Sequence, residues 1–193
     1  LFKKFPAGRL YDAGYGEKPA LGGTTTVIWN TKESKKEAEW LSLVGTTRNC
    51  AGGPTPWGSW VTCEESVDSV NAENKVEQNH GYCFEVPATP APALADPVPL
   101  KAMGRFNHEA IAVDPLSGAV YLTEDRADGL IYRFLPSKPG KLAEGGKLQA
   151  LKVRGVDSLD TRNWNWKEKR DIEVGHTMDV EWVDLEDVDG PKD

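Results

Sequence analysis

The sequence has no long hydrophobic run: its most apolar stretches are short and are interrupted by glycine or proline. A membrane-spanning helix needs about 18 or more apolar residues in succession, so we expect no membrane span. Positive charge is not in excess either, because 23 Lys+Arg stand against 30 Asp+Glu and give a formal net charge of -7. Diffuse attraction to nucleic acid or anionic lipid is therefore not expected, and hard cations suit such a chain better.

Cysteine is scarce as well. The three residues of this type, Cys50, Cys63 and Cys83, cannot all pair within one chain, and none of them belongs to a CxxC motif. This spacing excludes a zinc ribbon. A Cys63–Cys83 disulfide that leaves Cys50 free and a chain with three reduced thiols both fit the sequence.

Several familiar catalytic motifs are missing. The sequence contains no GxSxG, GxxxxGK[ST] or GxGxxG stretch, so serine hydrolases, nucleoside triphosphatases and dinucleotide-binding enzymes have no support. The three histidines, His80, His108 and His176, do not have the HExxH spacing of a zinc protease.

Glycine (19 residues), proline (13) and tryptophan (7) punctuate short apolar runs, and no long segment keeps a helical period. This pattern predicts a mostly β fold. Residues 32–39 could be helical on propensity alone, but the apolar runs on both sides favour a hairpin loop there. We also expect strands 59–65 and 80–86 to pair and the proline-rich segment 87–99 to be a surface connection. The expected strands are residues 24–30, 40–45, 59–65, 80–86, the two halves of 110–125, and 129–136.

This alternation of strands and short turns is typical of antiparallel meanders, which build β-propellers or β-sandwiches. The DPLSG turn inside 110–125 resembles the hairpins of propeller blades. A four-stranded blade takes about 40 to 50 residues, so 193 residues correspond to roughly four blades. We therefore expect an all-β chain with residues 1–193 in a single domain that covers part of a larger β-propeller.

Three stretches at strand ends concentrate chemically versatile side chains: NCAGG (49–53) with TCEE (62–65), GRFNHE (104–109) and TEDR (123–126). In the first, the glycines could hold Cys50 in a tight turn that faces a cavity. A thiolate there would bind iron or zinc, although a small buried hydrophobe is the simpler interpretation of the residues alone.

The carboxylates of these stretches are also ambiguous on their own. Glu64 and Glu65 are consecutive, so in a strand they point to opposite faces and only one can face a site. The pair His108 and Glu109 suits metal binding or acid–base work, yet an isolated His-Glu pair is usually a surface feature. The TEDR stretch offers two carboxylates for metal ions and an arginine for phosphate, or simply a solvated turn.

Taken in order, GGTTTVIWN, GTTRNCAGGPTPWGSWVTCEE, GRFNHEAIAVDP and VYLTEDRADGLIYRF resemble the PhoX-type alkaline phosphatase family. The resemblance runs from about Gly22 to Phe134 and continues loosely to VEWVDL (180–185). It implies a large β-propeller secreted to the periplasm or outside by the twin-arginine route. Because the sequence starts at Leu1 without a leader, we expect any export signal to have been removed or to lie outside the given residues. The resemblance also implies hydrolysis of phosphate esters at a central cluster of ferric iron and calcium ions.

On this chain the resemblance implies Cys50 as an iron ligand, Glu109 as an iron-binding carboxylate, and the Glu64–Glu65 pair as the source of a calcium ligand. A thiolate with a carboxylate suits iron, and oxygen ligands suit calcium. The full set of expected site residues is Glu109 and Arg126 for catalysis, Cys50, Glu64, Glu65, Glu109, Glu124 and Asp125 for metal binding, and Asn49 and His108 beside the ligands.

The chain departs from the family pattern just before the strand IYRF (131–134). An Arg-x-Glu arrangement of the family would fall on Ala127 and Gly129. Arg126 is one residue away and could substitute for the arginine, whereas Asp128, next to Gly129, would face the other way on a strand. Further ligands and blades are expected outside this chain. A non-catalytic calcium-stabilised binding propeller and a lactonase-like calcium hydrolase without sulfur ligands remain alternatives.

Overall fold

The structure, a computed structural model, describes residue 5 and residues 8–162 and 172–190. Within these residues the fold is all-β apart from short 3-10 turns. The turns are η2 (Gly14–Gly16), η3 (Lys101–Met103) and η4 (Leu142–Glu144). The strands are β1 (Gly22–Asn30), β2 (Lys35–Thr46), β3 (Asn49–Pro54), β4 (Ser59–Glu64), β5 (Cys83–Pro87), β6 (His108–Val113), β7 (Val120–Glu124), β8 (Ile131–Pro136), β9 (Gly146–Val153) and β10 (Val180–Asp184).

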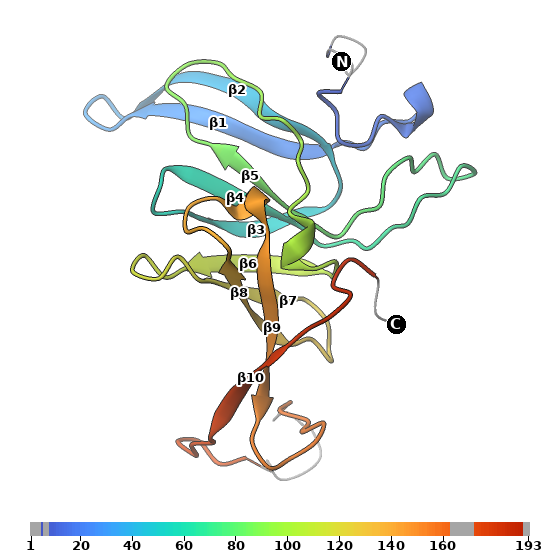
Figure 1. Cartoon of the computed structure of the whole chain (residues 1–193). Coiled ribbons are helices and arrows are strands. Elements are labelled where there is room, and N and C mark those ends of the chain that lie inside the picture. Colours follow the sequence, from blue (N-terminus) through green and yellow to red (C-terminus); the bar gives the residue numbers. More distant parts are fainter. Residues whose placement is uncertain (1–4, 6–7, 163–171, 191–193) are drawn as a thin grey trace.

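The strands form a two-stranded sheet, β1-β2, and an eight-stranded sheet in the order β10-β9-β8-β7-β6-β3-β4-β5. Neighbouring strands are antiparallel except β3 and β6, which are parallel and meet at the pair Gly52↔Ala110. In Figure 1 the β1-β2 hairpin lies at one end of the molecule and the β9-β10 pair extends away at the other. Neither sheet closes on itself among the described strands, so a propeller is not established by this arrangement.

The predicted hairpin between residues 24–30 and 40–45 is confirmed, but its second strand is longer than expected and begins at Lys35. The Asn30 side chain closes the connection, because its Oδ1 accepts hydrogen bonds from the backbone N–H groups of Lys32 and Glu33, both at 3.0 Å. Such a side-chain turn needs few residues. The rest of the polar stretch is therefore free to pair with β1, and the predicted loop shrinks to residues 31–34.

Most other predicted strands are also confirmed. Strands β4 and β5 pair with Thr62 opposite Phe84, and β6, β7 and β8 form the predicted meander. In the DPLSG turn, the Asp114 carboxylate accepts from the N–H groups of Leu116 and Ser117 at 3.1 and 3.2 Å. Residues 87–99 form no named strand, as expected. Strand β9 was not expected from the residues.

The expected tight turn around Cys50 is wrong, because Cys50 lies in strand β3 and pairs with Cys63 on β4. The two glycines serve a different purpose. A Cβ atom at Gly52 would lie 2.1 Å from the Val61 carbonyl oxygen, and one at Gly53 would lie 2.3 Å from the Ile111 carbonyl oxygen. Glycine thus lets β3 approach strands on both sides, and Gly52, with φ +67, sits where the β3-β4 register shifts.

The main hydrophobic core is built by strands β4 to β9 and by the turns η3 and η4. Its buried members are Val61, Cys63, Cys83, Leu100, Met103, Phe106, Ile111, Val120, Leu122, Tyr132, Phe134, Leu142, Leu148 and Ala150. Leu185 and Val188 pack against it from the segment after β10, so this segment returns to the body of the protein. Within the described part of the chain, no helix is long and apolar enough to cross a membrane.

Candidate metal centre

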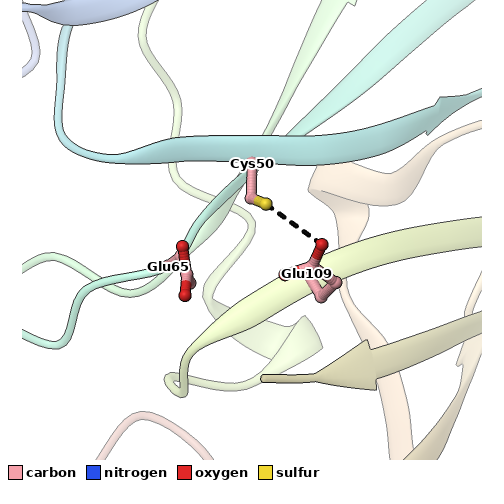
Figure 2. Close-up of side chains that lie close together, drawn as sticks. All are labelled: Cys50, Glu65 and Glu109. Carbon is pink, nitrogen blue, oxygen red and sulfur yellow. Dashed lines mark hydrogen bonds between the residues drawn. The ribbon is translucent and has the colours of Figure 1, made fainter. Parts of the chain in front are cut away.

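Three side chains with metal-binding atoms converge where β3, β4 and β6 lie side by side. They are Cys50 on β3, Glu65 directly after β4, and Glu109 on β6. One ligand atom from each lies within 4.8 Å of the others. The Cys50 Sγ donates a hydrogen bond to the Glu109 Oε1 at 3.1 Å, and Figure 2 shows both carboxylates gathered near the thiol. We call these three residues the cluster.

The sheet itself brings the cluster together. The parallel pair Gly52↔Ala110 places Cys50 two residues before the contact on β3 and Glu109 one residue before it on β6. Glu65 is held beside β3 because its backbone N–H donates to the Arg48 carbonyl at 3.0 Å. Glycine permits the close approach of β3 and β6, so the Gly-Gly sequence is what allows Cys50 and Glu109 to come together.

The donor set of the cluster fits a metal ion. It combines one thiol with two carboxylates, all partly exposed, which leaves room for water or substrate. Thiolate selects transition metals such as iron or zinc, whereas carboxylate also suits hard cations. The hydrogen bond to Glu109, together with partial burial, raises the pKa of the Cys50 thiol. In this state the thiol proton lies between the Cys50 sulfur and the Glu109 carboxylate.

The three thiols should differ sharply in reactivity. Cys63 and Cys83 are fully buried, with their sulfurs 3.6 Å apart and not bonded to each other, while Cys50 is partly exposed. After full reduction, we expect one thiol to react rapidly with an aromatic disulfide reagent in the folded protein, and all three in denaturant. The rapid reaction should accelerate with pH, because the thiolate is the nucleophile, and should disappear in Cys50→Ser. Two rapidly reacting thiols would contradict this assignment.

Glu64 lies outside the cluster and is completely buried. Its Oε1 accepts a hydrogen bond from the backbone N–H of Thr47 at 2.9 Å, and its Oε2 accepts from Gly81 and Tyr82 at 2.9 and 3.3 Å. Its Oε1 also lies 2.7 Å from the Nδ1 of His80. With both carboxylate oxygens occupied by protein groups, Glu64 serves the packing of β4 and β5. Of the Glu64–Glu65 pair, the structure therefore brings only Glu65 to the metal-binding atoms, in line with the alternation of a strand.

His80 connects Glu64 to the N-terminal part of the chain. Its Nε2 lies 3.0 Å from the Asp12 Oδ2, and all three side chains are at most 2% exposed. Burial alone would lower the pKa of His80, but the hydrogen bonds and negative charges of Glu64 and Asp12 outweigh burial and raise it. When protonated, His80 can donate to both carboxylates and so links residues far apart in the sequence.

This network predicts a pH dependence of stability. Since the pKa of His80 is higher in the folded than in the unfolded state, its contribution is fully present below about pH 6.5 and is lost as pH rises through the folded-state pKa. We expect the unfolding free energy, measured in urea between pH 6 and pH 9, to decrease with pH more steeply in the wild type than in His80→Gln. Parallel curves for the two proteins would contradict the charged state of His80.

The TEDR carboxylates do not join the cluster. The Glu124 Oε2 accepts hydrogen bonds from the Tyr132 hydroxyl at 2.8 Å and from the Leu130 N–H at 3.2 Å. Asp125 is exposed. Arg126 donates from Nε to the Asp128 Oδ1 at 3.2 Å. Glu124 and Arg126 instead line a neighbouring cavity of about 170 Å³.

The loop after β7 also explains the residue at position 129. A Cβ atom at Gly129 would lie 2.7 Å from the Glu124 carbonyl oxygen and 3.0 Å from that of Arg126. The Gly129 N–H donates to the Arg126 carbonyl at 3.0 Å and closes the turn. A glutamate at this position would require a different loop, so the missing carboxylate follows from the local backbone.

Asn49 and His108, expected beside the ligands, have partners elsewhere. The Asn49 Nδ2 donates to the Thr62 hydroxyl at 3.0 Å, and its Oδ1 accepts from the Thr46 hydroxyl at 2.7 Å, which ties β3 to its neighbours. His108 is fully buried, and its Nε2 lies 3.0 Å from the Gly104 carbonyl oxygen. Burial lowers the pKa of His108 to about 4, so it donates from Nε2 as a neutral ring. Its Nδ1 has no hydrogen-bond partner among the described residues.

One residue beside the cluster, Asn107, was not expected from the sequence. The Asn107 Nδ2 donates to the Glu65 carbonyl oxygen at 3.4 Å, and the Asn107 carbonyl accepts from the Asp125 N–H at 3.0 Å. Asn107 thus connects the segments that carry Glu65, Glu109 and the TEDR stretch. Its place inside GRFNHE was visible, but an asparagine before a His-Glu pair carries no signal of its own.

Comparisons with known proteins place these residues in a family. A family model described as "Alkaline phosphatase PhoX" matches residues 17–192. Among solved structures, Pseudomonas fluorescens PhoX in complex with vanadate, a transition state analogue, is similar with 22% identity and a TM-score of 0.45. That alignment covers 68% of this chain and 32% of the other, so the chain spans about a third of that protein. A search of curated proteins found no match. Because the family model covers nearly the whole sequence, the chain belongs to the PhoX alkaline phosphatase family.

Proposed function

We propose that this chain carries metal ligands of a phosphoric-ester hydrolase, with Cys50, Glu65 and Glu109 as those ligands. One observation supports the proposal above all: in a chain of the PhoX family, a thiol and two carboxylates from three separate segments come within 4.8 Å of one another. The thiol argues against the lactonase-like alternative, whose site would consist of carboxylates alone.

For the ions, we propose ferric iron and calcium, as the family resemblance suggests. Cys50 and Glu109 would hold iron, because a soft and a hard donor together suit a transition metal, and Glu65 would offer its oxygens to calcium. When bound, the ions would polarise the phosphoryl group and activate an oxygen nucleophile. Glu124 and Asp125, which lie outside the cluster, would serve further ions in the complete site.

Arg126 is the candidate for binding the phosphate oxygens. Its guanidinium group can donate two parallel hydrogen bonds to such an anion. In this structure it contacts Asp128, and both side chains are exposed. An exposed ion pair of this kind contributes little stability. Arg126 can therefore leave Asp128 and bind a doubly charged phosphate with little loss of free energy. It would then replace the arginine that the family pattern expects at the position of Ala127.

The wider architecture that we propose is a β-propeller, with residues 1–193 in one domain that supplies part of it. Strands β3 to β5 and β6 to β10 are two antiparallel meanders that touch at one parallel pair, an arrangement compatible with adjacent blades. The remaining blades and ligands would come from other segments of the same propeller. We propose a secreted or periplasmic location on the basis of family membership.

The proposed function is tested by hydrolysis of an aryl phosphate before and after chelation, together with iron and calcium analysis. We expect metal-bearing protein whose turnover is lost on chelation and restored by the two metals. Metal-free protein without chelator-sensitive turnover would contradict the hydrolase. Bound calcium without any turnover would instead support a binding propeller, and lactone turnover that does not depend on Cys50 would support a lactonase-like enzyme.

A further inference from the structure

A cavity of about 170 Å³ lies beside the cluster, between the ends of β6, β7 and β8 and the segment that follows β10. This segment is fixed to the body, since the Leu185 N–H donates to the Leu148 carbonyl at 3.0 Å and the Arg105 N–H donates to the Val188 carbonyl at 2.9 Å. The lining is mainly apolar and includes Phe106, Leu130, Tyr132, Leu148, Leu185 and Val188.

Two aromatic rings in this lining are held rigidly. Phe106 and Tyr132 are stacked with ring centroids 4.3 Å apart and an interplanar angle of 17°. The Tyr132 hydroxyl is fixed by its hydrogen bond to Glu124 at 2.8 Å. Preorganised aromatic and aliphatic walls with a few polar groups are typical of small-molecule sites. The polar groups here, Glu124 and Arg126, belong to the TEDR stretch.

The cavity adjoins the cluster through Asn107. This residue lines the cavity, and its side chain donates to the Glu65 carbonyl oxygen. It also precedes Glu109 by two positions, so the Cα atoms of the two residues are at most about 7 Å apart. A phosphoryl group at the cluster could therefore place its ester substituent in the cavity.

The volume limits what the cavity can hold. Apolar cavities of about 150 Å³ accept a benzene ring in other proteins, so about 170 Å³ accommodates one six-membered ring. We propose that this cavity binds the aromatic leaving group of single-ring aryl phosphate monoesters, an inference that rests on the proposed function. Hydrolysis of such an ester adds the oxygen of water to phosphorus, breaks the P–O bond to the ring, and releases a phenol that carries one proton of that water.

Binding of two phosphonates that cannot be hydrolysed in this way provides the test. Calorimetry on the metal-loaded protein should show phenylphosphonate binding about tenfold or more tightly than methylphosphonate, because the ring is removed from water. In Val188→Phe, whose added ring occupies the cavity, the preference should fall to about one. Val174→Phe is the matched control, since Val174 is 87% exposed and outside the cavity, and it should keep the wild-type preference.

Leu130 lies at the rim of the cavity and is 46% exposed, so Leu130→Phe provides a second test if Val188→Phe does not fold. This variant should also lower the preference for phenylphosphonate. Methylphosphonate binding without a preference for the phenyl compound in the wild type would overturn the cavity assignment alone. An unchanged preference in both cavity variants would do the same. Failure of both phosphonates to bind, with no turnover of any phosphate ester, would overturn the proposed function and the cavity assignment together.

Discussion

Replacing Cys50 with serine is expected to remove the transition metal and to reduce phosphate-ester hydrolysis by about 100-fold or more. The substitution keeps the size of the side chain but replaces a thiolate donor with a hydroxyl that does not ionise near neutral pH. Loss of groups that merely orient metal ligands costs about 10- to 100-fold in affinity or activity, and Cys50 would contact the ion itself. Iron content per chain and turnover of an aryl phosphate measure the effect.

Cys63→Ala is the matched control for this experiment. Cys63 lies directly opposite Cys50 on β4, but it is buried in the hydrophobic core and is not part of the cluster. Its replacement should lower stability while leaving metal content unchanged. Full metal content and turnover in Cys50→Ser would show that the thiol is not a ligand.

Adjacent glutamates should respond in opposite ways to the same substitution. Glu64→Gln is expected to lower the unfolding free energy by about 3 to 5 kcal/mol, because it leaves the buried His80 charge without one of its partners. The new amide group would also face backbone N–H donors such as that of Gly81. Glu65→Gln should change stability by about 1 kcal/mol or less, because its contact with Arg48 at 3.4 Å is a long and partly exposed ion pair.

Metal binding should show the reverse order for the two glutamates. Glu65→Gln removes a charged donor of the cluster, so we expect loss of calcium or weaker iron binding, whereas folded Glu64→Gln should retain both metals. Urea unfolding together with metal analysis separates the two effects. Metal loss from folded Glu64→Gln, with unchanged metal content in Glu65→Gln, would show that Glu64 and not Glu65 is the metal ligand.

Much of the fold followed from local sequence signals. The DPLSG turn marked its hairpin correctly, because the Asp114 carboxylate bonds to nearby backbone groups and requires no distant partner. The parallel contact of β3 with β6 could not be predicted in this way. It depends on the absence of a Cβ at Gly53 next to Ile111, a residue far away in the sequence.

The candidate site, too, could be predicted only where local sequence signals determine it. Alternation along a strand indicated that only one of Glu64 and Glu65 could face a site, but not which one. The choice is made by His80, which contacts Glu64 through one ring nitrogen and Asp12 through the other, in a buried network assembled from distant segments. Likewise, the TEDR stretch offered carboxylates without indicating where they point, and it is Tyr132 and the turn at Gly129 that direct Glu124 toward the neighbouring cavity.

Anomalous diffraction from crystals of the iron- and calcium-loaded protein tests the central claim most directly. Data collected on both sides of the iron absorption edge locate iron without reference to any assumed ligand. We expect an iron peak bounded by the Cys50 sulfur and the Glu109 carboxylate, with Glu65 at the edge of the same metal cluster. An iron peak elsewhere, or a cluster whose thiol and carboxylates contact no metal in iron-loaded crystals, would contradict this expectation.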